Sequence, residues 1–190
     1  QSALNALRKY GVRTDFIARG GDRVGIYYLE TGASMRPSKV IYDRAHSSIA
    51  EADPQDFDFD AIMEGADWFH WSGISAAVSA ETAAVCAEEI DVAREMGLTV
   101  SCDINYRKNL WKYGKEPQEV LPPLMEQCDI FFGTDDEYEK ILGMRLPKFE
   151  ARDASYRPDT AGYERASAEV AARFPRCRGI VFGLRSVLSA

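Results

Sequence analysis

Leu98-Thr-Val-Ser-Cys-Asp-Ile-Asn-Tyr-Arg-Lys-Asn-Leu-Trp111 is the stretch of sequence that decides the fold. Its first five residues, apart from Ser101, are apolar or β-branched and predict a strand buried in a parallel sheet. An acid, an amide and a guanidinium follow that strand directly. Ligands of open α/β sheets bind beyond the carboxyl ends of the strands, so we expect Asp103, Asn105 and Arg107 to line a crevice. Arginine pairs with carboxylate or phosphate through two parallel hydrogen bonds, which indicates a small anionic ligand.

Strands and helices alternate on both sides of this stretch. Before it, Ser79 is a credible N-cap for a helix that runs to about Met96, with Gly97 after it. Units of this length imply right-handed crossovers and a doubly wound parallel sheet, which places the chain in the α/β class. The pattern predicts further strands at 67–72, 129–132 and 179–182, and helices at about 57–63, 117–127, 135–142 and 160–173.

The first fifty residues follow a different pattern. Residues 1–10 read as the last turns of an amphipathic helix that Gly11 ends. Arg23–Glu30 alternates as a one-sided strand does, and Lys39–Arg44 completes a hairpin after a turn. We therefore expect residues 23–45 to form a β-hairpin lid on an α/β core made of residues 1–22 and 46–190.

Composition excludes several classes of function. The net charge of −7 and the sequence pI near 5.0 argue against nucleic acid and anionic membranes as partners. No apolar run approaches the roughly 20 residues that span a bilayer, so we expect a soluble, cytoplasmic protein. The four cysteines lie far apart, and the sequence contains neither a Walker-type phosphate loop nor a G-x-G-x-x-G motif.

Each candidate site also has a purely structural interpretation. Arg107 is equally explained by a salt bridge within a loop, and Tyr27 and Tyr42 by packing across a β pair. Thr134 and Glu137 are explained by a capping box at a helix start, because the acid there favours the positive end of the helix dipole. A carboxylate at that place is also suited to Mg²⁺, which prefers oxygen ligands and keeps much of its water.

The chain resembles the middle part of a ribokinase-like (PfkB) carbohydrate kinase, most closely the 2-keto-3-deoxygluconate kinases. The specific part of the resemblance is the Asp103-x-Asn-Tyr-Arg-x-x-Leu-Trp111 string together with Tyr-x-Arg on the lid. Further matching strings are Arg23–Glu30, Val40–Ala45, Trp71-Ser-Gly-Ile74 and Thr134–Gly143. The resemblance implies a three-layer α/β/α fold with a mostly parallel sheet and a small β lid, incomplete at both ends.

The resemblance also implies a reaction and site residues. The γ-phosphoryl of ATP would pass to the 6-hydroxyl of 2-keto-3-deoxygluconate, with Mg²⁺ as cofactor. The expected metal residue is Glu137, although Thr134 replaces the family's asparagine at the start of that element. Nucleotide contacts are expected at Asn105, Gly183, Arg185 and Ser186. Substrate contacts are expected at Tyr27, Tyr42, Asp43, Arg44 and Arg107.

The family's catalytic aspartate is expected beyond Ala190, and its glycine-rich substrate segment before Gln1. No catalytic residue is therefore predicted within the 190 residues, and this stretch by itself is expected to be inactive. Two alternatives stay open: a kinase of the same fold for a neutral sugar such as fructose, and a non-catalytic module for oligomerisation or ligand sensing. A homodimer or higher oligomer built through the lid is expected because a hairpin has open edges.

Overall fold

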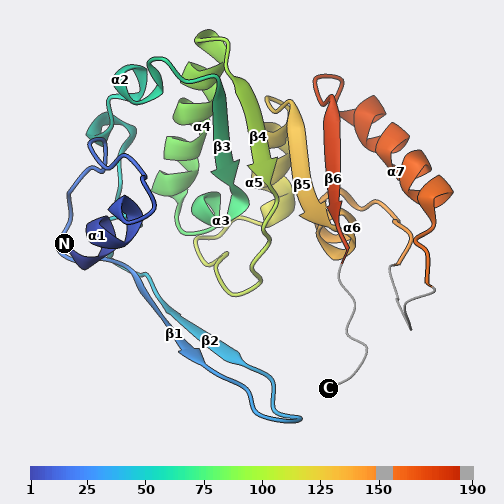
Figure 1. The fold of residues 1–190 in the computed structure, drawn as a ribbon, viewed down its shortest axis with the longest axis horizontal. Helices are drawn as coiled ribbons and strands as arrows, with labels where there is room; N and C mark the ends of the chain where they lie inside the picture. Colours follow the sequence, from blue (N-terminus) through green and yellow to red (C-terminus); the bar gives the residue numbers. More distant parts are fainter. Residues whose placement is uncertain (149–155, 185–190) are drawn as a thin grey trace.

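The computed structural model describes residues 1–148 and 156–184. Four strands form a parallel sheet, in which each strand pairs with the next one along the chain (Figure 1). Their apolar and β-branched residues are typical of strands in a buried parallel sheet. The four strands predicted from the sequence are confirmed: β3 (Trp68–Ser72), β4 (Thr99–Asp103), β5 (Ile130–Thr134) and β6 (Gly179–Gly183).

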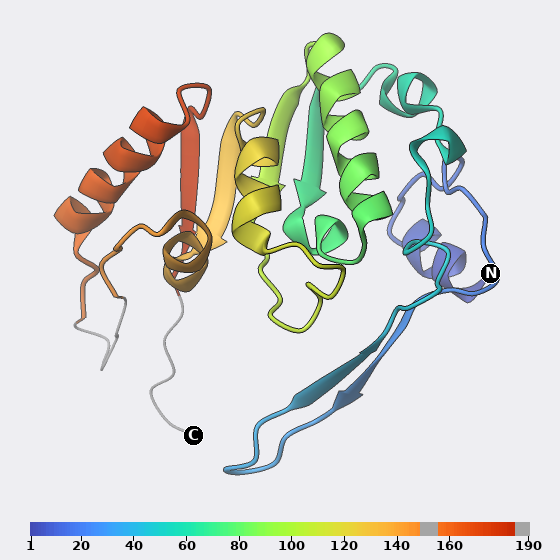
Figure 2. The ribbon, with the colours of Figure 1, turned by 180° about the vertical axis from the view of Figure 1, so that it is seen from behind.

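The long helices cover one face of this sheet. Figure 2 shows α4 (Ala80–Glu95) and α5 (Pro117–Met125) in front of the strands. Helices α6 (Asp135–Leu142) and α7 (Thr160–Arg173) follow β5. Because strand order equals chain order, right-handed crossovers place every connecting helix on the same side. The α/β class and the parallel sheet are confirmed, but the described residues form only one of the two helical layers that we expected.

The core lies between the sheet and these helices. Val100, Cys102 and Phe131 are fully buried on the helical side, and the ring of Phe131 packs edge-on against Phe174 at 5.1 Å between centroids. Burying a valine or phenylalanine side chain of this kind stabilises the fold by about 1.5–3 kcal/mol. On the opposite face, Trp68 remains 52% exposed. Its indole N–H donates to the Ser101 hydroxyl at 2.7 Å.

Local signals explain where the main helices begin and end. The Ser79 hydroxyl accepts a hydrogen bond from Thr82 N at 3.1 Å, so α4 begins where the sequence predicted. Gly143 ends α6 in the left-handed conformation, with φ 70°. Sequence reasoning missed the four-residue helix α3 (Gly73–Ala76), which follows β3 without a loop. The remaining helices are α1 (Ser2–Arg8), the 3-10 helix η1 (Pro54–Asp56) and α2 (Phe59–Met63).

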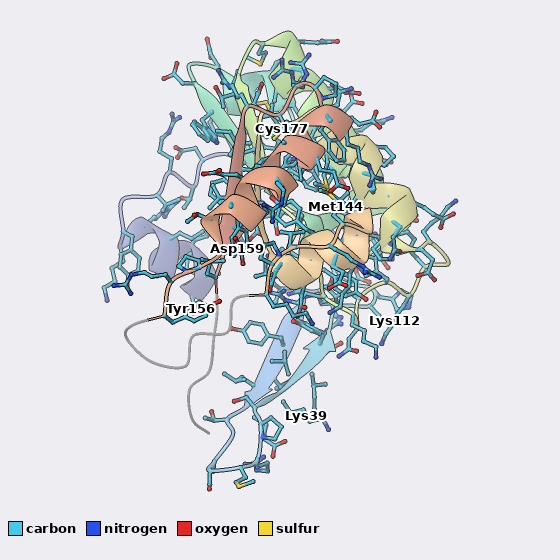
Figure 3. The ribbon with its side chains drawn as sticks, turned by 90° about the vertical axis from the view of Figure 1, so that its right-hand side faces the viewer. Lys39, Lys112, Met144, Tyr156, Asp159 and Cys177 are labelled. Carbon is cyan, nitrogen blue, oxygen red and sulfur yellow. The ribbon has the colours of Figure 1, made fainter. Side chains whose placement is uncertain are left out.

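Strands β1 (Ile26–Glu30) and β2 (Lys39–Asp43) form the predicted antiparallel hairpin. It projects from the side of the molecule toward which the sheet strands point (Figure 1), and Figure 3 shows Lys39 on it, below the body of the molecule. The sequence predicted that this strand starts at Arg23, but β1 begins three residues later, at Ile26. The Arg23 carbonyl accepts a hydrogen bond from Ser48 N at 2.7 Å and does not pair with β2. At the hairpin base the Arg23 guanidinium donates two hydrogen bonds to the Asp43 carboxylate, from Nη2 to Oδ1 at 2.5 Å and from Nη1 to Oδ2 at 3.0 Å.

No helix within residues 1–148 and 156–184 has both the length and the apolar character needed to cross a bilayer. The division into a lid of residues 23–45 and a core of residues 1–22 and 46–190 stays a prediction.

Candidate functional site

A polar cavity of about 640 Å³ lies at the carboxyl ends of β4, β5 and β6; we call it the strand-end cavity. It forms there because the three strands are parallel and end at the same edge of the sheet. Its polar side chains comprise one amide, one guanidinium, one hydroxyl and four carboxylates. They are Asn105, Arg107, Thr134, Asp103, Asp135, Asp136 and Glu137.

The loop after β4 is fixed at three consecutive backbone amides. Ile104 N donates to Phe132 O at 2.9 Å, Asn105 N to Asp103 Oδ1 at 3.2 Å, and Tyr106 N to Glu137 Oε1 at 2.8 Å. Asn105 itself has a left-handed backbone, with φ 42°. Asparagine tolerates this conformation better than most residues, so the motif's amide stands at a position that suits its type.

Glu137 links the loop after β4 to the start of α6. Its Oε2 accepts from Thr134 N at 2.9 Å and lies 3.0 Å from Thr134 Oγ1, which completes the predicted capping box. Its Oε1, besides accepting from Tyr106 N, lies 3.8 Å from Arg107 Nη1. The capping interpretation of Glu137 is therefore confirmed, and the same carboxylate faces the strand-end cavity.

Asp103 is the most perturbed acid of this cavity. Partial burial raises its pKa, and the neighbouring Glu137 carboxylate raises it further. The Asn105 N–H, His70 and Arg107 act in the opposite direction and lower it. A carboxylate whose ionised form is disfavoured gains most from a cation, so the cavity favours a ligand that brings positive charge with it.

The lid divides its predicted substrate residues between two faces. In the register of the hairpin, Tyr27 lies opposite Tyr42, so both side chains share one face. The Arg44 guanidinium stacks over the Tyr42 ring at 4.8 Å from the centroid. Asp43 belongs to the other face, where Arg23 holds it. Strand alternation predicts this separation, and our residue assignment from the sequence overlooked it.

Arg44 and Arg107 line different cavities. Arg44 lies on a second cavity of about 580 Å³ at the base of the lid, the lid-base cavity, together with Gly25, Ile74 and Ser75. Arg107 lies on the strand-end cavity. The structure thus brings Asn105, Arg107, Glu137 and Gly183 together, but not Arg44 with Arg107.

Two further predicted residues, Arg185 and Ser186, lie outside the described residues. Conversely, sequence reasoning did not assign Asp135 and Asp136 to the site, although both line the strand-end cavity. The available signal was their place directly after β5, where a strand ends at the same sheet edge as β4.

A parallel α/β core with a polar cavity at its strand ends and a two-stranded lid defines a class of proteins that bind small polar ligands at the sheet edge. Residues 1–161 match the model of the pfkB family carbohydrate kinases, and the chain belongs to this family.

Two curated proteins show what the chain is similar to in sequence. The chain is 32% identical over 136 residues to the 2-dehydro-3-deoxygalactonokinase of Haloferax volcanii, covering 72% of this chain and 42% of that protein. It is 29% identical over 152 residues to the 2-dehydro-3-deoxygluconokinase of Escherichia coli K12, covering 76% of this chain and 48% of that one.

A solved structure extends the comparison to the fold. The 2-dehydro-3-deoxygluconokinase of Thermotoga maritima superposes with a TM-score of 0.86 at 43% identity, over 98% of this chain and 54% of that chain. The present chain thus spans about half the length of the relatives it matches.

Proposed function

We propose that the protein is an ATP-dependent kinase that phosphorylates the 6-hydroxyl of 2-keto-3-deoxygluconate, the compound also called 2-dehydro-3-deoxygluconate. The observation that carries the proposal is the convergence of Asn105, Arg107 and Glu137 on one strand-end cavity in a chain of the pfkB family. Phosphoryl transfer depends chiefly on positioning and on electrostatic stabilisation, and this cavity supplies groups for both.

We propose Mg²⁺ as the cofactor because the acidic lining of the strand-end cavity favours it. Four carboxylates and one guanidinium would repel a triphosphate that arrived without cations. Among residues 1–148 and 156–184, no group of histidine, cysteine, aspartate and glutamate side chains is placed to cage a metal ion by itself. We infer that Glu137 contacts Mg²⁺ through water while the ATP phosphates supply direct ligands, which agrees with the reluctance of Mg²⁺ to lose its water.

Asn105 and Gly183 are the proposed nucleotide contacts in the described part of the chain, since both line the strand-end cavity. Tyr27, Tyr42 and Arg44 are proposed to contact the sugar acid from the lid, and Arg107 from the core. An arginine from either cavity suits the carboxylate that distinguishes the sugar acid from a neutral sugar. Asp43 is proposed to act indirectly, because its bond to Arg23 fixes the hairpin base beside Arg44.

The test uses the protein expressed from its complete gene in an assay that couples ADP release to a spectroscopic signal. Phosphorylation of 2-keto-3-deoxygluconate should require ATP, stop on addition of EDTA and resume with excess Mg²⁺. Arg44→Ala and Arg107→Ala should each raise KM for the acid about tenfold or more, because each removes a charge-assisted hydrogen bond. Neither should raise KM for fructose more than about twofold.

Arg165→Ala is the matched control, because Arg165 is exposed on α7 and lines neither cavity. It should leave both KM values unchanged. If fructose were turned over as well as the acid, the neutral-sugar alternative would replace the proposal. If no sugar were phosphorylated, a ligand-sensing module would be the better assignment.

We also propose that two copies associate through the lid. Tyr28 and Ile41 lie opposite each other and are each at least half exposed on a hairpin that packs on little else. Two-stranded hairpins are marginally stable in water by themselves, so a partner surface would stabilise this one.

A further inference from the structure

Ser72 stands where β3 meets the loop that carries the proposed nucleotide contact. Strands β3 and β4 are parallel neighbours, and Ser72 pairs with Asp103 in their register. The residues that follow the two strands therefore leave the sheet side by side. Ser72 is the N-cap of α3, which begins at Gly73, and Asp103 leads into Asn105.

The side chain of Asn105 is held by Ser72. Asn105 Nδ2 donates to Ser72 Oγ at 2.9 Å. The backbone on both sides of Asn105 is already fixed by the three consecutive amides described above, so the direction in which its side chain leaves the loop is set. Two side-chain torsions remain: the first is limited to staggered rotamers, and the last, which rotates the amide group, is broad in the absence of a partner. The bond to Ser72 selects one orientation.

Gly73 makes this contact possible. A Cβ at residue 73 would lie 2.2 Å from Ile104 O, which is far inside van der Waals contact. The absence of a side chain lets the start of α3 approach the loop closely enough for residue 72 to reach Asn105. Ile74, one residue further on, lines the lid-base cavity. The Ser72–Ile74 segment thus lies between the two cavities, although Ser72 itself lines neither.

We propose that Ser72 is a positioning residue for the nucleotide. Its hydroxyl holds the Asn105 amide so that the remaining N–H faces the strand-end cavity, where it donates to the ATP phosphates. This inference rests on the proposed function, since it needs Asn105 to contact ATP. The inference goes beyond the proposed function because it assigns a role to Ser72, a residue that touches neither substrate nor nucleotide.

The kinetic test compares Ser72→Ala, Ser72→Thr and Asn105→Ala in the protein from the complete gene. Ser72→Ala should raise KM for ATP about three- to tenfold, the value of one hydrogen bond, and leave KM for the sugar acid within about twofold. Ser72→Thr keeps a hydroxyl and should restore KM for ATP. In the Asn105→Ala background, Ser72→Ala should have no further effect on KM for ATP, because the group it positions is gone.

Other outcomes would assign Ser72 a structural role only. Ser72 Oγ also accepts weakly from Ile74 N, at 3.5 Å, so loss of the α3 cap is the competing explanation. That explanation predicts a lower melting temperature and parallel changes in both KM values, with the same effect in the Asn105→Ala background. Any of these kinetic results overturns the proposal.

A readout without activity separates this proposal from the kinase assignment. In protein labelled with ¹⁵N-asparagine, the Asn105 side-chain amide protons should exchange with solvent slower in wild type and Ser72→Thr than in Ser72→Ala. Equal exchange in all three would overturn the positioning role even in an active kinase. If exchange were slow in wild type and Ser72→Thr but fast in Ser72→Ala, the contact between Ser72 and Asn105 would be established. If the same protein phosphorylated no sugar, the proposed function would be wrong although the contact exists.

Discussion

Tyr138 is the largest side chain that the fold buries completely. Its hydroxyl has no hydrogen-bond partner among the described residues, and burial raises its pKa. An unpaired buried hydroxyl loses its bonds to water without replacement. We expect Tyr138→Phe to raise the free energy of unfolding, measured in urea, by about 1 kcal/mol.

Tyr163→Phe is the matched control for Tyr138→Phe. The Tyr163 hydroxyl donates to Pro147 O at 2.9 Å, so its removal should lower the free energy of unfolding by about 0.5–1.5 kcal/mol. Destabilisation of the same size in both variants would contradict our account of Tyr138.

Some residues of the candidate site were predictable from the strand pattern and others were not. Asn105 and Glu137 are 32 positions apart, yet both follow parallel strands, so the strand pattern alone predicts that they meet. Arg44 was harder to place, because its cavity depends on how the hairpin base packs on residues 16–25 and on α3. The bond between Ser72 and Asn105 needed the register of β3 with β4, and no local pattern gives that register.

Long helices with clear capping residues at their ends were predicted correctly, and the shortest helices were missed. Helix α4 carries a serine cap and a following glycine, and both of its ends agree with the sequence. Helix α3 has four residues, too few for an apolar period to show, and its cap Ser72 is also the last residue of β3. The short helix at Pro54–Asp56 was missed for the same reason.

Helix α4 carries an acid that should make stability depend on pH. Burial raises the pKa of Glu89 to about 7. Because the pKa is raised in the folded state, the stabilising contribution is complete below the unfolded value of about 4.3 and is lost as pH rises through about 7. Relative to Glu89→Gln, the wild type should lose up to about 3 kcal/mol of stability between pH 5 and pH 8.

Urea unfolding of wild type and Glu89→Gln at several pH values gives this difference directly. Glu88→Gln is the matched control, because Glu88 is exposed on the same helix. A stability difference between wild type and Glu89→Gln that stays constant with pH would contradict the expectation.

At the scale of the whole molecule, exposed apolar side chains gather on the lid and on the sheet face opposite the helices. Parallel sheets are normally covered on both faces, yet Trp68 and Val181 are 52% and 43% exposed here. The lid exposes apolar residues on both of its faces, with Leu29 and Val40 beside Tyr27 and Tyr42. If this face closes over the sugar acid, the opposite face is the one left for a second copy.

Self-association should therefore depend on the lid face that carries Tyr28 and Ile41, which lie opposite each other in the hairpin. Light scattering on the protein from the complete gene should give the mass of a dimer at micromolar concentration. Ile41→Asp should give a monomer, because it places a charge in an apolar contact. Tyr27→Ser, on the other face, should keep the dimer mass and raise KM for the sugar acid. A monomeric wild type, or an Ile41→Asp variant that remains dimeric, would show that this face of the lid is not the interface.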